Sequence, residues 1–259
     1  MDVSVIIVNY NTLQLTLNCI NSIVNKTVGI NYEIILVDNA STDGSKECFE
    51  RDNRVTYIYS KKNGGFGYGN NLGMKVAIGK YFFLLNSDTL LVNNAIKEFY
   101  EYAEAHNPKT IYGCYLQGED GSYRMSFFDF PAFTITEFLL RRFHIRHGYK
   151  VDFSIKNVDA ITGADMFLPR DAIADVGMFD ENIFMYGEEG EWQYRMKQKG
   201  YARVIITSPK IIHLEGESTK KSNYIRTIDG HFYTLRKHMP RWKYLLARAY
   251  YAIIQYIIH

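Results

Sequence analysis

The run Val3-Ser-Val-Ile-Ile-Val-Asn-Tyr-Asn11 decides the fold class of this chain. Its first six residues form a short, mostly apolar segment rich in β-branched side chains, which is typical of a strand buried in a parallel sheet. A helix is expected next, because apolar residues recur at helical spacing from Leu13 to Val24. A buried strand followed by a helix predicts the first unit of an α/β fold.

The same alternation continues through the first half of the chain. Further strands are predicted at Glu33–Val37, Val55–Tyr59 and Tyr81–Leu85, with helices between them and another from about Asn94 to Ala105. We therefore predict a Rossmann-like, mostly parallel central sheet flanked by helices. Such sheets bind ligands at the carboxyl ends of their strands, so polar residues that directly follow each strand are candidates for a site.

The second half is less regular, and its pattern predicts no separate domain. Gly118–Ser122 is typical of a hairpin turn, Val158–Leu168 of a strand passage and Glu191–Lys199 of a helix. A short strand at Val204–Ile206 and a helical C-terminal region follow. We predict one α/β domain over residues 1–240 and an amphipathic, aromatic helical tail over residues 241–259.

The composition argues against several classes of function. The 259 residues carry a formal net charge of only +2, which gives no argument for nucleic-acid binding. Three widely spaced cysteines predict neither a disulfide framework nor a zinc site, and they favour a reducing compartment. The N-terminus lacks the basic start of a secretory signal, and Tyr244–Ile258 is too short and too polar to span a bilayer. We expect a cytoplasmic protein.

Small polar and acidic side chains follow three of the predicted strands. Asn9 and Asn11 follow the first strand, Asp38 follows the second, and the run Asn86-Ser-Asp88 follows the fourth. A single such residue is more often a turn former than a ligand. Three groups at one edge of a parallel sheet instead favour binding of a nucleoside, or of a divalent cation held against phosphates.

The glycine-rich run Asn63-Gly-Gly-Phe-Gly-Tyr-Gly69 does not match the dinucleotide fingerprint. That fingerprint directly follows the first strand, where this chain has Asn9-Tyr-Asn11 and no glycine. A nicotinamide or flavin enzyme is therefore disfavoured. The glycines are equally consistent with a flexible turn and close packing of the next helix.

An acidic cluster in the second half is a candidate for proton transfer. Glu188, Glu189 and Glu191 follow the apolar run Phe184-Met-Tyr-Gly187 and directly precede Trp192. Carboxylates this close together are typical of a solvated helix start. At a boundary between polar and apolar surroundings, a carboxylate has instead a raised pKa and can act as a general base. The residues alone leave both interpretations open.

Taken together, these motifs resemble glycosyltransferase family 2, which has the GT-A fold, and are close to its rhamnosyltransferase-like branch. The resemblance covers about residues 3–240. The motifs that carry it occur in the family's order and spacing: Ser4–Asn11, Val37–Asp43, Asn63–Asn71, Leu85–Asp88, Thr162–Asp165, Gly177–Asp180, Phe184–Trp192 and His213.

The resemblance implies a role for each matching position. Asp88 and His213 are implied as metal ligands, with Asn86 standing where the family's Asp-x-Asp motif has its first carboxylate. Glu189 falls on the catalytic base, which is usually an aspartate, and Glu188 is the alternative base. The implied nucleotide contacts are Asn9, Asn11, Asp38, Asn63, Asn86 and Ser87. The positions implied on the acceptor side are Asp165, Glu191 and Trp192.

The resemblance also implies the reaction and its partners. It predicts inverting transfer of rhamnose or a hexose, with Mn²⁺ or Mg²⁺, from a dTDP- or UDP-sugar to a glycan or a lipid-linked acceptor in bacterial surface polysaccharide synthesis. The glutamate pair departs from the usual Glu-Asp, so a catalytically weakened nucleotide-sugar-binding protein is one alternative. A nucleotidyltransferase is a weaker one, because it usually needs a glycine-rich basic loop after the first strand.

Two basic and aromatic segments bear on where the protein works. Arg141, Arg142 and Arg146 alternate with apolar residues, and the C-terminal region combines Trp242 with several cations. Such segments suit peripheral association with an anionic membrane, here the inner face of the cytoplasmic membrane. A packed helix or a homodimer contact is the alternative for the C-terminal region, and the sequence does not rank them.

Overall fold

The computed structural model describes residues 1–130, 152–214 and 220–258. Its first half alternates strands and helices, as the sequence predicts. The elements are β1 (Val3–Asn9), α1 (Leu13–Lys26), β2 (Tyr32–Asp38), α2 (Ser45–Phe49), β3 (Thr56–Tyr59), α3 (Phe66–Val76), β4 (Tyr81–Asn86), β5 (Thr89–Leu91) and α4 (Ala95–Ala105).

The second half adds strands to the same sheet and ends in two helices. Its elements are β6 (Thr110–Gln117), β7 (Phe127–Phe128), β8 (Lys156–Asn157), β9 (Ala160–Ile161), β10 (Asp165–Pro169), α6 (Asp171–Val176), α7 (Glu188–Gln198), β11 (Ala202–His213), α8 (Lys220–His238) and α9 (Arg241–Ile258). The predicted turn at 118–122 is confirmed, since the Gly118 N–H donates to the Ser122 carbonyl at 2.8 Å.

The main sheet has the order β3-β2-β1-β4-β10-β6-β11-β5, with β8 paired to β11. β1 is parallel to β2 and β4, β2 is parallel to β3, and β6 is parallel to β11. β10 and β5 run antiparallel to their neighbours. The mostly parallel α/β fold is therefore confirmed. The sequence interpretation missed β5 and β6, and it placed only the first half of β11.

Apolar cores lie on both faces of this sheet, which explains the nearly continuous apolar strands. Val5 and Ile7 pack on one face with side chains of α1 and α4, whereas Ile6 packs on the other face with side chains of α3 and α7. Successive strand residues point to opposite faces, so each needs an apolar side chain. The two layers hold the carboxyl ends of the strands rigidly at one edge.

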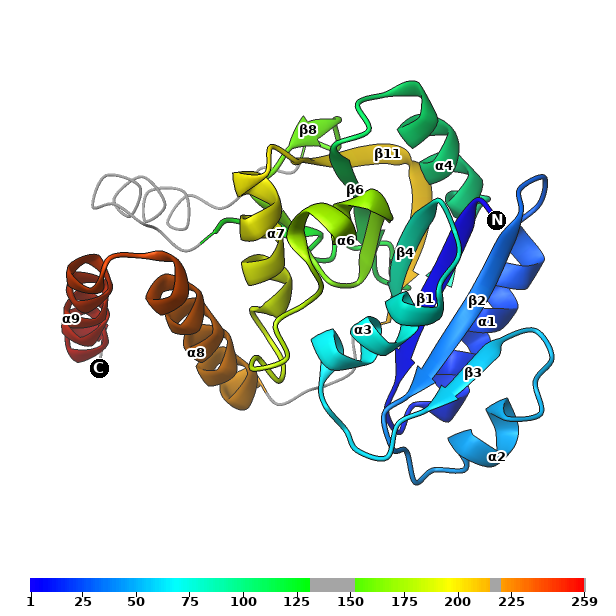
Figure 1. Ribbon diagram of the computed structural model, residues 1–259, viewed down its shortest axis with the longest axis horizontal. Coiled ribbons are helices and arrows are strands. Elements are labelled where there is room, and N and C mark those ends of the chain that lie inside the picture. Colours follow the sequence, from blue (N-terminus) through cyan, green and yellow to red (C-terminus); the bar gives the residue numbers. More distant parts are fainter. Residues whose placement is uncertain (131–151, 215–219, 259) are drawn as a thin grey trace.

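The two C-terminal helices lie to one side of the sheet (Figure 1). α8 packs against α7, and α9 continues beyond it. α9 begins at Arg241, where the tail was expected to start. None of the helices within the described parts of the chain is long and apolar enough to cross a membrane. The basic segment with Arg141, Arg142 and Arg146 lies outside the described residues.

Candidate functional site

The strand-end residues lie side by side at one edge of the sheet, as the sequence predicts. In the register of the parallel strands, Asn9 of β1 is opposite Asp38 of β2, and Val8 is opposite Asn86 of β4. Asn86 also donates its backbone N–H to the Ala164 carbonyl at 3.1 Å, which joins this edge to the loop before β10. The edge therefore collects groups from four separate parts of the sequence.

Asn9 organises the loop that follows β1. Its side chain is fully buried. The amide oxygen accepts hydrogen bonds from the hydroxyls of Thr12 and Thr16 at 2.8 and 2.9 Å, and the amide nitrogen donates to Ser41 Oγ at 3.0 Å. Thr12 Oγ1 lies 3.1 Å from Ser87 Oγ. Asn9 thus fixes the loop backbone, and Ser87 is tied to the same network.

Asp38 is buried, and both of its carboxylate oxygens already accept hydrogen bonds. Oδ1 accepts from the Ser41 N–H at 2.8 Å, and Oδ2 accepts from the Tyr57 hydroxyl at 2.8 Å. Asn11, which adopts a left-handed φ of 54°, accepts from the Thr42 N–H at 2.8 Å. Asp38 and Asn11 therefore hold the loops after β1 and β2 together, and their contact with a nucleotide stays a prediction.

Asp88 and His213 meet where β5 pairs with the end of β11. Asp88 Oδ1 lies 3.3 Å from His213 Nε2, and the Leu214 N–H donates to the Asp88 carbonyl at 2.9 Å. Their side chains are 20% and 14% exposed, so both remain accessible to a ligand. Within the described residues, no group of three or more His, Cys, Asp or Glu side chains is suited to a metal ion. A cation here would take two protein ligands and complete its shell with ligand oxygens and water.

The glycine-rich turn before α3 contacts the loop that leads into α7. Asn63 Oδ1 accepts from the Gly65 N–H at 3.0 Å, and Gly65 has a φ of 86°. A Cβ on Gly65 would lie 1.7 Å from the Phe184 carbonyl oxygen, and the Phe66 N–H donates to that same oxygen at 3.3 Å. Only glycine permits this approach. The turn expected beside the nucleotide therefore supports the loop that precedes the glutamate pair.

Glu188 and Glu189 form a coupled pair in the first turn of α7. Glu188 is 3% exposed and Glu189 is half-buried, with Oε2 accepting from the Gly187 N–H at 3.2 Å. Burial and the neighbouring Glu189 charge raise the pKa of Glu188 well above its usual range. Burial also raises the pKa of Glu189, while the hydrogen bonds from Gly187 and Glu188 oppose that rise. Both pKa values are raised, so the two coupled carboxyl groups retain a proton more readily than separate glutamates would.

Glu191 forms ion pairs with side chains of α7 and α8. It is fully buried, lies 3.0 Å from Arg195 Nη2, and its Oε1 lies 2.8 Å from Lys237 Nζ and 2.9 Å from His238 Nε2. Hydrogen bonds from Arg195 and Lys237 outweigh burial and lower the pKa of Glu191. Burial itself is the largest single effect and acts in the opposite direction. Glu191 therefore joins α8 to α7.

The other two residues implied on the acceptor side are also buried. Trp192 donates from Nε1 to the Gly177 carbonyl at 2.8 Å, and its ring lies 4.0 Å from that of Phe179. Asp165 Oδ2 accepts from the Cys114 N–H at 2.7 Å, and burial raises the pKa of Asp165 to about 7. Like Glu191, neither side chain presents surface to a ligand in this structure. Their role toward an acceptor stays a prediction.

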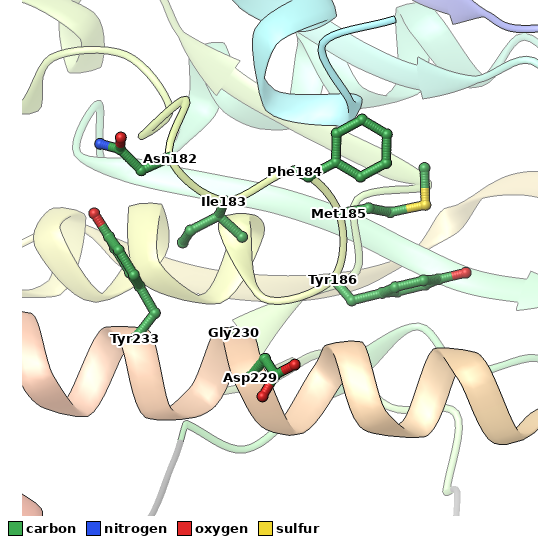
Figure 2. A pocket seen from close by; sticks show the side chains of 8 residues that line it. All are labelled: Asn182, Ile183, Phe184, Met185, Tyr186, Asp229, Gly230 and Tyr233. Atoms are coloured by element: carbon green, nitrogen blue, oxygen red, sulfur yellow. The ribbon is translucent and has the colours of Figure 1, made fainter.

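The sequence interpretation did not anticipate a cavity between the loop 182–186 and α8. The cavity has a volume of about 240 Å³, and α8 contributes Asp229, Gly230 and Tyr233 to its lining (Figure 2). No local signal connects these residues to the loop, because the two segments are separated along the chain by α7 and β11. Only the packing of α8 brings them together.

Comparison with known proteins identifies the class. The sequence model of "Glycosyl transferase family 2" matches residues 4–175, so the chain belongs to that family. The chain is 31% identical over 130 residues to "Glycosyltransferase GlyG" of Streptococcus pneumoniae. The aligned region covers 49% of this chain and 43% of that protein. The chain therefore matches less than half the length of that relative.

Solved structures confirm the GT-A fold. The structure is similar to that of GalNAc-T7 with UDP, GalNAc and Mn²⁺, with a TM-score of 0.66 and 17% identity over 88% of this chain and 48% of that one. It is equally similar to the mannosyltransferase PcManGT of Pyrobaculum calidifontis in complex with GDP-Man and Mn²⁺, over 96% of this chain and 69% of that one. At this identity, the likeness shows the fold alone.

Proposed function

We propose that this family 2 glycosyltransferase performs inverting, metal-dependent transfer of rhamnose or a hexose from a pyrimidine nucleotide-sugar to an acceptor hydroxyl. The observation that carries the proposal is the Asp88 carboxylate beside the His213 imidazole, 3.3 Å apart at the carboxyl end of the sheet. Carboxylate and imidazole together suit Mn²⁺ better than Mg²⁺. Mn²⁺ accompanies the nucleotide in both structural neighbours, one of which holds UDP and the other GDP-mannose.

The donor set fits a divalent cation that is shared with a diphosphate. When bound, the cation would neutralise the charge that develops on the leaving diphosphate. Asp88 and His213 would hold it. The residues of the β1 and β2 loops would position the nucleoside, because Asn9, Asn11 and Asp38 fix the backbone there. The pyrimidine preference rests on the family resemblance.

Glu189 is the base in this proposal. It would remove the proton of the acceptor hydroxyl as that oxygen attacks the anomeric carbon on the face opposite the leaving group, which inverts the configuration. Glu188 supports this role because its raised pKa keeps it protonated and leaves the charge on Glu189. Glu189 is also the more exposed of the two side chains.

The setting of the reaction is also part of the proposal. We place the protein in the cytoplasm, with a glycan or lipid-linked acceptor in bacterial surface polysaccharide synthesis. α9 supports contact with the inner face of the membrane, because Trp242, Leu245 and Leu246 are 60%, 54% and 58% exposed beside Lys243 and Arg248. A homodimer contact through the same face is the alternative.

A thermal-shift screen of dTDP- and UDP-sugars with and without Mn²⁺ tests the proposal. Ligand at a hundred times its Kd stabilises the folded state by about 2.7 kcal/mol, which raises Tm by roughly 5–10 °C for a chain of this size. The shift should require Mn²⁺ and should disappear in Asp88→Ala but persist in the exposed control Glu119→Ala. An equal shift in Asp88→Ala would overturn the metal assignment. Pyrophosphate release from a nucleoside triphosphate and a sugar phosphate would favour a nucleotidyltransferase instead.

A further inference from the structure

The cavity between the loop 182–186 and α8 lies outside the segment matched by the family. The matched segment ends at residue 175, whereas every residue that lines the cavity lies between 182 and 233. Figure 2 shows the loop lying alongside α8, with the Tyr233 side chain extending from the helix toward the loop and Asp229 on the helix itself. The cavity thus combines the start of the Phe184–Trp192 motif with residues of α8.

Close backbone contacts hold the two walls of the cavity together. A Cβ on Gly230 would lie 2.1 Å from the Tyr186 carbonyl oxygen, so α8 approaches the loop as closely as glycine allows. The Tyr233 hydroxyl donates to Asp180 Oδ2 at 2.8 Å, and Lys237 Nζ lies 2.6 Å from the same oxygen. These contacts fix the two walls relative to each other, and a rigid cavity reduces the entropy cost of binding.

The loop separates this cavity from the glycine-rich turn. Gly65 and Phe66 contact the carbonyl of Phe184. α8 contacts the same loop at Tyr186, two residues before Glu188. A ligand in the cavity therefore contacts the loop that leads into α7 and its glutamate pair. It lies on the α8 side of that loop, whereas the turn expected to face the nucleotide lies on the other side.

The lining matches the chemistry of a sugar ring. Phe184, Tyr186 and Tyr233 supply aromatic rings, and Asp229 and Asn182 supply a carboxylate and an amide. Aromatic faces cover the apolar faces of a pyranose, while carboxylate and amide groups bond its hydroxyls. The volume is below the roughly 300–1,000 Å³ of pockets for drug-sized ligands, so it suits one ring.

The charge of the side chains that line the cavity favours some acceptor molecules over others. Among the residues that the structure describes, the lining contains one carboxylate and no cationic side chain, which disfavours a phosphate-bearing polyol. We propose that this cavity is the acceptor subsite and that it binds one neutral pyranosyl residue of a glycan, with Asp229 accepting from its hydroxyls and Phe184 contacting its ring face. This assignment rests on the proposed function.

Saturation-transfer NMR tests the assignment in the full chain with Mg²⁺ and UDP present. The probes are methyl pyranosides of glucose, galactose, rhamnose and N-acetylglucosamine, with ribitol 5-phosphate as the anionic comparison. We expect at least one pyranoside to bind more tightly than ribitol 5-phosphate. Asp229→Asn should weaken its binding about tenfold, since a hydrogen bond to a charged group contributes that much. Phe184→Ala should weaken it by a similar factor because the contact with the ring face is lost. The matched controls, Glu119→Gln and Phe153→Ala, change an exposed carboxylate and an exposed phenylalanine away from the cavity.

The outcomes separate this assignment from the proposed function. Pyranoside binding that is equal in Asp229→Asn, Phe184→Ala and wild type overturns the cavity assignment, as does the absence of pyranoside binding in wild type or a preference for ribitol 5-phosphate. The Mn²⁺-dependent thermal shift with dTDP- or UDP-sugars reports on the nucleotide site alone, and the absence of any such shift in wild type would overturn the proposed function. Weakened pyranoside binding in the two variants would still support the cavity.

Discussion

Replacement of Glu191 by glutamine tests how α8 is held against the body of the protein. The carboxylate is fully buried and faces two cations, Arg195 of α7 and Lys237 of α8, together with the His238 imidazole of α8. Glutamine keeps the shape and one acceptor but removes the charge. Lys237 then faces a neutral group at this site.

The size of the destabilisation depends on the hydrogen-bond acceptors that Arg195 and Lys237 retain in the variant. Breaking a buried ion pair by removing one partner costs about 3–5 kcal/mol. Arg195 retains two backbone carbonyl acceptors at 2.6 and 2.7 Å, and Lys237 retains Asp180 at 2.6 Å, so the cost falls at or below the lower limit of this range. We expect Glu191→Gln to lower the free energy of unfolding by about 2–3 kcal/mol, which lowers Tm by roughly 4–12 °C.

Urea denaturation at neutral pH measures this change. The matched control is Glu101→Gln, which breaks an exposed pair with Lys97 at 3.6 Å and should cost less than about 0.5 kcal/mol. A loss in Glu191→Gln no larger than that of the control would refute the reasoning. The pKa of Glu191 is lowered in the folded state. The stabilisation is therefore present above the unfolded pKa of about 4.3 and is lost as the pH falls through the folded pKa.

Three further predictions concern catalysis, stability and location. Glu189→Gln should lower kcat by at least about 100-fold, because it removes the proposed base. Glu188→Gln mimics a protonated glutamate and should keep kcat within about tenfold of wild type. Steady-state transfer assays compare the two variants, and the opposite ranking would assign the base to Glu188. The pKa of Glu188 is raised in the folded state, so its contribution to the free energy of unfolding decreases as pH rises above the unfolded pKa of about 4.3. Glu188→Gln should remove this decrease, which urea titrations across pH measure. In a vesicle sedimentation assay, Trp242→Glu with Leu246→Glu should abolish binding to anionic vesicles, and a size change in chromatography instead would point to the dimer contact.

Much of the fold could be predicted from the sequence because the central strands are buried on both faces. Val3–Val8 and Tyr81–Leu85 are nearly continuous apolar runs, and such runs leave few alternatives to a covered parallel sheet. Their ends are then fixed by polar residues. The juxtaposition of Asn9, Asp38 and Asn86 follows directly from parallel pairing.

The missed elements lack such a signal. β6 contains Gly113 and two tyrosines among its apolar residues, and β5 has only three residues. Both are strands because neighbours pair with them, which no local pattern reveals. The same holds for the cavity, since Tyr233 and Phe184 line it together only through the packing of α8. Glu191 was assigned by its position in a motif, and its partners Lys237 and His238 on α8 are equally remote in sequence.

The glutamate pair need not signal lost activity. A general base must be ionised and must reach the acceptor hydroxyl. Glu188 is almost fully buried with its pKa raised, so it is poorly suited to both tasks, whereas Glu189 is half-buried and its carboxylate is bonded by the Gly187 N–H. Glutamate at 189 adds one methylene to the reach of an aspartate, and the backbone contact at Gly187 limits the rotamers of that longer chain. In the proposed mechanism, one glutamate of the pair therefore keeps a proton and the other acts as the charged base. The proposal places the charge on Glu189 because its side chain is the more exposed.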